Sequence, residues 1–147
     1  MIHSLRALLD AFPLAPIQLM LRLGIGLLFW RSGLTKVVTN EAGDLPAFPP
    51  ALAAGTVDLF TTEYKVPLLP PELAATLAAS GELVLPVFLV LGLFGRFAAA
   101  GLLAMTLVIQ WVYPSNWAEH LFWAGALLLI LSRGPGTLSL DALIWRR

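Results

Sequence analysis

The chain contains no cysteine, and its only two histidines are His3 and His120. The absence of cysteine excludes disulfide bonds, thiolate metal sites, iron–sulfur ligation and covalent attachment of a c-type haem, and it leaves the redox compartment undetermined. Because His3 lies at the extreme N-terminus, a bis-histidine haem within one subunit is not expected. No haem or iron–sulfur ligand set is therefore evident.

Charged residues are also scarce. They make up 12% of the 147 residues, sum to no net charge and form no basic run, so nothing indicates nucleic-acid binding. Hydrophobic residues account for 59%, and the mean hydropathy of +0.84 is too high for a soluble domain of this length. The composition predicts an integral membrane protein, with the lipid bilayer as a partner. The start does not resemble a cleavable signal peptide, because its apolar stretch is too long and too charged.

The most informative stretch is 17–38, which is apolar enough to cross a bilayer yet contains Arg22, Arg31 and Lys36. At about 1.5 Å per residue a helix of this length would extend roughly 33 Å, the thickness of a hydrocarbon core. Charges in a membrane are costly, so neighbouring helices or water must supply partners. At about 100° per residue, one face of this helix is predicted to consist of Arg22, Gly26, Phe29, Gly33 and Lys36. We expect this face to point toward the interior of the bundle and Arg31 to point the other way.

The rest of the chain completes an all-α, four-helix transmembrane bundle in a single domain, 1–147. Its predicted spans are 17–38, 70–94, 97–113 and 117–131. A long extramembrane loop, 39–69, is expected to contain a short helix over 56–64, capped by Thr56, with Leu59 and Phe60 laid on the mouth of the bundle. Short surface helices are expected at the membrane interface near the N-terminus (1–12) and in the tail (134–147), where Ser139 can act as a cap.

Positive charge predicts the orientation. Five arginines are predicted on the side of the membrane that holds the two termini: Arg6, Arg96, Arg133, Arg146 and Arg147. The other side is predicted to hold Lys36 and Lys65 together with a larger number of acidic residues. The positive-inside rule therefore predicts that both termini are cytoplasmic and that the long loop is outside.

Glu82 lies almost at the middle of the second span, and Pro86 follows four residues later. That proline removes the hydrogen bond that the carbonyl of Glu82 would accept, which predicts a kink and a free carbonyl beside a buried carboxylate. An arginine within about 4–6 Å would hold the carboxylate ionised, so we expect Arg22 to pair with Glu82, directly or through water. Two roles are open for this pair: it takes part in the chemistry of the protein, or it only fixes the register of the helices.

A second polar group is expected in the outer half of the bundle. Its members are Arg31, Lys36, Gln110, Glu119 and His120, together with the carboxylates of the outer loop. Together they could line a pocket for a quinone, which needs hydrogen-bond donors to its two carbonyl oxygens and an apolar slot for its isoprenoid tail. The alternative is that Lys36 extends to the interface and that Glu119, His120, Trp117 and Trp123 anchor the helix there. A metal site is not expected, because adjacent helix residues point about 100° apart.

These motifs resemble those of the DoxX family. The matching residues are Arg22-x-Gly24, Phe29, Gly33-x-x-Lys36, Glu82, the L-x-x-G-L-x-x-R hairpin of Leu89, Gly92, Leu93 and Arg96, the run Ala98–Ala100, and GPGTLSLD at 134–141. Arg31 departs from the family pattern. The W-x-x-H-L-x-W run at 117–123 and the long outer loop are similar to family members encoded beside enzymes that mature small metal-binding peptides.

The resemblance implies a four-helix protein of the bacterial inner membrane. The family name derives from a quinone-linked thiosulfate or terminal oxidase system, and many members are described only as membrane proteins or suspected oxidoreductase subunits. No catalytic residue set is present, so at most the chain is an oxidoreductase subunit, working with a protein partner or as a homo-oligomer and using a borrowed redox centre or quinone. The alternative from a different class is a scaffold or transporter-like module that binds or exports a partner peptide.

Overall fold

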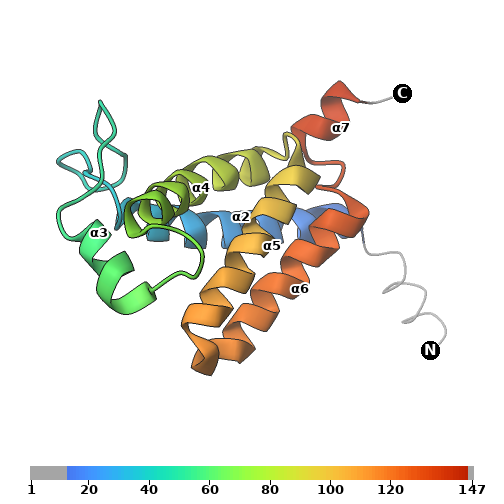
Figure 1. Ribbon diagram of the computed structural model, residues 1–147. Helices are drawn as coiled ribbons and strands as arrows, with labels where there is room; N and C mark the ends of the chain where they lie inside the picture. The colour runs from blue at the N-terminus through green and yellow to red at the C-terminus, as the bar shows by residue number, and fades with distance from the viewer. Residues whose placement is uncertain (1–12, 146–147) are drawn as a thin grey trace.

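The computed structural model describes residues 13–145, and the surface helix expected over 1–12 lies outside this range. Four long helices dominate the fold (Figure 1): α2 (Leu14–Leu34), α4 (Pro71–Leu91), α5 (Gly95–Val112) and α6 (Trp117–Arg133). Four short elements connect or follow them: α3 (Thr56–Leu59), the π-helical turn η1 (Phe60–Tyr64), the 3₁₀ turn η2 (Pro114–Asn116) and α7 (Leu140–Ile144).

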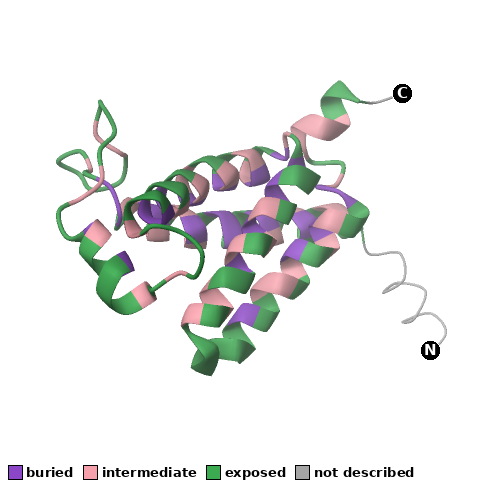
Figure 2. Cartoon of the chain, in the orientation of Figure 1, coloured by how far each residue is buried: buried purple, intermediate pink, exposed green. Residues whose placement is uncertain are grey.

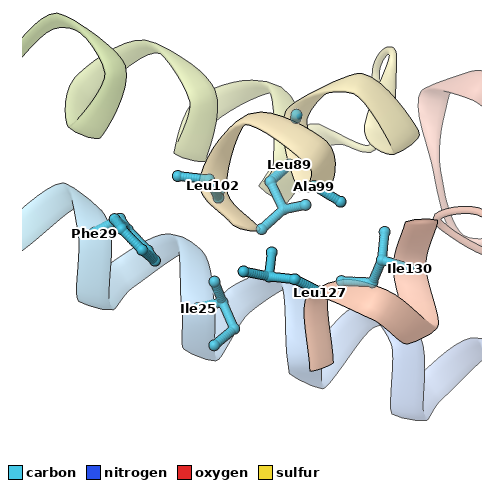
Figure 3. Packing of buried hydrophobic residues seen from close by; sticks show 8 residues of the cluster. Ile25, Phe29, Leu89, Ala99, Leu102, Leu127 and Ile130 are labelled. Atoms are coloured by element: carbon cyan, nitrogen blue, oxygen red, sulfur yellow. The ribbon is translucent and has the colours of Figure 1, made fainter. Parts of the chain in front are cut away.

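Each long helix packs against two others: α2 against α4 and α6, and α5 against α4 and α6. Their shared core is apolar (Figure 3) and consists of Ile25, Phe29, Leu89, Ala98, Ala99, Leu102, Leu127 and Ile130. The alanines come from α5, and their small side chains let neighbouring helices approach closely.

The outer faces of the helices are exposed (Figure 2), and large apolar side chains lie on them. Examples from α2, α5 and α6 are Met20, Phe97, Trp111 and Phe122, each more than 70% exposed. A soluble protein would not present so much apolar surface to water. Within residues 13–145, α2, α4 and α5 are long and apolar enough to cross a membrane, and α6, at 17 residues, is slightly shorter.

Helix α2 differs from the predicted span 17–38 at both ends. It begins already at Leu14, because Pro16 falls in the first helical turn, where no intrahelical hydrogen bond is lost. It ends at Leu34, because the chain beyond it turns back and pairs Val37 with Leu52. Lys36 consequently lies just past the helix rather than inside it.

The interior face predicted for the first span is confirmed on α2. Its five residues, Arg22, Gly26, Phe29, Gly33 and Lys36, are all buried, and Arg31 is exposed on the other side. A Cβ at Gly33 would lie 2.9 Å from the side chain of Leu83 and 3.1 Å from the backbone of Glu82. Gly33 therefore sets how closely α2 and α4 approach, and it places Glu82 at the C-terminal end of α2.

The segment between α2 and α4 folds over one end of the helices. After isolated antiparallel bridges at Val37–Leu52 and Thr39–Pro46, it forms α3 and η1, which confirms the helix expected over 56–64. The predicted cap is wrong: Gly55 precedes the helix with φ of 83°, and the Thr56 hydroxyl donates instead to the carbonyl of Lys36. Phe60 is buried, but Leu59 is exposed.

Candidate functional site

A cavity of about 440 Å³ lies between α2, α4, α5, α6 and the η1 turn. Most of its wall is apolar and includes Leu28, Phe29, Val66, Leu69, Leu77, Met105, Val108, Ile109 and Val112. Polar side chains are also present in the lining: Ser32, Lys36, Tyr64, Glu82, Tyr113, Asn116, Glu119 and His120. An apolar chamber with a few polar groups is the usual form of a small-molecule site.

The central polar contact is an ion pair between Lys36 and Glu82. The Lys36 Nζ atom lies 2.7 Å from Oε2 of Glu82, and both side chains are nearly inaccessible, at 9% and 5% exposed. The Lys36 ammonium also donates to the carbonyl and the hydroxyl of Ser32, at 3.2 and 3.1 Å. Its three N–H donors are thus all used inside the protein.

The backbone around Lys36 is fixed as well. Its carbonyl accepts hydrogen bonds from the amide of Ala53 at 3.0 Å and from the hydroxyl of Thr56 at 3.1 Å. The Glu82 carboxylate accepts the Lys36 ammonium through Oε2, and the Ser32 hydroxyl lies beside the same carboxylate. A carboxylate offers about four lone-pair sites, so the ion pair leaves acceptor capacity on Glu82.

A second acceptor comes from His120, which is buried in the first turn of α6. Its Nδ1 atom lies 2.7 Å from Oε1 of Gln110, and the amide nitrogen of Gln110 donates to the carbonyl of Pro114. Because that second bond fixes the orientation of the Gln110 amide, the histidine must donate through Nδ1–H. In the neutral imidazole, Nε2 then carries a lone pair and accepts a hydrogen bond.

Aromatic residues link the cavity to the segment that covers it. Tyr64 of η1 packs edge-on against Phe60 and Tyr113, and the Tyr113 hydroxyl donates to the carboxylate of Glu63. This contact joins the η1 turn to the end of α5.

Arg22 lies at the opposite end of the helices, and the predicted Arg22–Glu82 pair is wrong. The guanidinium donates to four carbonyls: those of Leu89 at 2.9 Å, Pro135 at 2.8 Å, Leu138 at 2.7 Å, and Val90. The physical reason is the antiparallel register of α2 and α4, which brings Arg22 to the C-terminal end of α4. The last carbonyls of a helix lack intrahelical partners and attract a cation.

The other residues predicted for the site do not all lie at the cavity. Glu119 lines the cavity but is exposed, whereas Arg31 is exposed and does not line it. Arg96 belongs to a second groove at the Arg22 end, and Pro86 is buried inside α4, which continues past it. The interpretation that Lys36 extends to the interface is wrong, because its ammonium is buried in an ion pair.

Ser32 and Tyr64 were not predicted. The signal for Ser32 was its position four residues before Lys36, which places both on one helical face. Within residues 13–145, no group of three or more histidine, aspartate or glutamate side chains could hold a metal ion.

The apolar outer faces of several long helices define a multi-pass helical membrane protein. A family model described as DoxX matches residues 17–114, well over half of the chain. The chain belongs to the DoxX family. Comparison with curated proteins and with solved structures finds no match.

Proposed function

We propose that the cavity binds the reduced, hydroxyl-bearing form of a membrane quinone, and that the chain serves as a small membrane component of a quinone-linked redox system. The observation that carries this proposal is the pair of acceptors in the lining, the Glu82 carboxylate and Nε2 of His120, in an otherwise apolar cavity. Acceptors select a ligand that donates, and a quinol carries two hydroxyl donors.

The size and walls of the cavity support the same ligand class. Small-molecule sites are typically about 300–1,000 Å³ and largely apolar, with a few placed polar groups, and this cavity of about 440 Å³ falls in that range. The quinol ring would lie against aromatic residues such as Trp123 and Phe29, which pack edge-on at 5.9 Å. The protein supplies binding and orientation, whereas electron transfer requires a partner that exchanges electrons with the bound quinol.

The test is the quinone content, oxidised plus reduced, of mildly solubilised protein compared with bulk membrane. We expect near-stoichiometric quinone per wild-type chain and at least a fivefold loss in Ala78→Phe, because Ala78 lines the cavity and a phenyl group would fill it. The matched control is Ala100→Phe, on the exposed face of α5, which should retain the quinone. Wild-type protein without enrichment would overturn the proposal and favour the scaffold or transporter-like alternative.

We also propose that α6 is a fourth span and that both termini face the cytoplasm of the bacterial inner membrane. At about 1.5 Å per residue, the 17 residues of α6 extend roughly 26 Å. The arginines at the Arg22 end and the acidic segment at the cavity end support this orientation through the positive-inside rule.

Because the chain has no cysteine, a single introduced thiol reports the side directly. In intact spheroplasts, a membrane-impermeant maleimide should label Glu41→Cys, whereas Arg96→Cys should be labelled only after permeabilisation. Both side chains are exposed, so access to the reagent is limited by the membrane alone. Labelling in the reverse order would contradict the orientation.

A further inference from the structure

A second groove, of about 850 Å³, opens at the Arg22 end of the helices, between the start of α2, the α4–α5 turn and the segment after α6. Its charged lining consists of Arg96, Arg133 and Asp141. The carboxylate of Asp141 already accepts the backbone amides of Phe94 and Gly95, at 2.8 and 2.9 Å. The two arginines, both exposed, form no ion pair with any residue in 13–145.

The two arginines lie at the same level of the fold. Arg96 is the second residue of α5 and Arg133 is the last residue of α6, and these antiparallel helices pack side by side. Their guanidinium groups therefore lie where the apolar length of both helices ends. In a bilayer this is the level of the lipid head groups.

The rim of the groove is apolar and aromatic. Phe94, Phe97 and Trp145 all belong to its lining and are 51%, 78% and 67% exposed. Tryptophan is typical of the membrane interface, and phenylalanine side chains there contact acyl chains. The groove thus combines two exposed arginines with a surface that suits lipid tails.

We propose that this groove binds the phosphate of an anionic phospholipid between Arg96 and Arg133. Guanidinium groups donate to phosphate oxygens in a bidentate geometry, and basic pockets at the ends of transmembrane helices recognise anionic lipid head groups. The apolar rim favours a lipid over a soluble anion, because a free phosphate would leave the aromatic side chains uncovered. This site is separate from the quinol cavity and does not depend on its function.

The test uses the full chain in nanodiscs of phosphatidylcholine with added phosphatidylglycerol, followed by detergent extraction and quantification of retained lipid. Wild-type protein should retain phosphatidylglycerol about tenfold over its share in the disc. The double variant Arg96→Gln, Arg133→Gln should lose this preference, and Arg96→Lys, Arg133→Lys should retain part of it. The control Arg31→Gln, Lys65→Gln removes two exposed cations elsewhere and should behave as wild type.

Three results would overturn the proposal. One is wild-type protein that does not prefer phosphatidylglycerol, which can be measured even if the double variant fails to fold. Another is a folded double variant with an unchanged preference. The third is inorganic phosphate that displaces phosphatidylglycerol at millimolar concentration, which would indicate a site for a soluble anion.

Discussion

Replacing Arg22 by Gln is expected to lower the free energy of unfolding by about 4–6 kcal/mol, since hydrogen bonds from a charged donor contribute roughly 1.5–3 kcal/mol each. Arg22 is 1% exposed, and its guanidinium donates to carbonyls at the end of α4 and in the segment after α6. A glutamine amide has two N–H donors and cannot satisfy four acceptors. Thermal unfolding in detergent micelles, followed by circular dichroism, measures the effect.

The matched control is Arg31→Gln on the same helix, which should change stability by less than about 0.5 kcal/mol because Arg31 is exposed. Arg22→Lys should fall between wild type and Arg22→Gln, because an ammonium keeps the charge but not the planar array of donors. Equal stability of Arg22→Gln and Arg31→Gln would show that the carbonyl contacts contribute nothing.

Replacing Glu82 by Leu is expected to cost about 3–5 kcal/mol, because it leaves the buried ammonium of Lys36 without its counter-ion. The double variant Lys36→Met, Glu82→Leu should recover most of that loss, because two apolar side chains of similar volume suit the same environment. A double-mutant cycle on unfolding free energies isolates the coupling between the two positions.

Glu119→Leu is the control for the Glu82 substitution, because it removes an exposed carboxylate that lines the same cavity. It should change stability by less than about 0.5 kcal/mol. A double variant as unstable as Glu82→Leu alone would show that the stranded charge is not the cause, and packing at position 82 would then explain the loss.

The features that sequence could predict are those that depend on local spacing. The 3.6-residue period placed Arg22 and Gly33 on the interior face and Arg31 outside it, and each of these positions is confirmed. The short tail helix has the cap that its serine predicted, with the Ser139 side chain accepting the amide of Ala142 at 3.2 Å. Such contacts lie within a turn or two of the chain, so their geometry follows from the type of residue.

The partners of the buried charges could not be predicted in the same way. Which of Arg22, Arg31 and Lys36 meets Glu82 depends on how far α4 is shifted along α2, and no local pattern reports that register. It is set by contacts such as Gly33 against Leu83 and Gly26 against Val90. The position of Lys36 was also difficult to predict, because α2 ends before it, at Leu34.

The α4–α5 turn shows how tightly the Arg22 end is constrained. Gly92 has φ of 66°, and a Cβ there would lie 2.5 Å from Ser139 and 3.0 Å from the guanidinium carbon of Arg22. Its carbonyl accepts the amide of Asp141 at 2.9 Å. The glycine is therefore required twice, for the left-handed turn and for the close approach of the segment after α6.

The contacts of Arg22 also impose an order on the biosynthesis of the protein. Two of its acceptors, Pro135 and Leu138, lie 113 and 116 residues further along the chain. At about 5–20 residues per second, the ribosome reaches them roughly 6–23 s after it has passed Arg22. During that interval α2 carries a guanidinium with an incomplete set of acceptors, so this early-made helix is among the last to reach its final place.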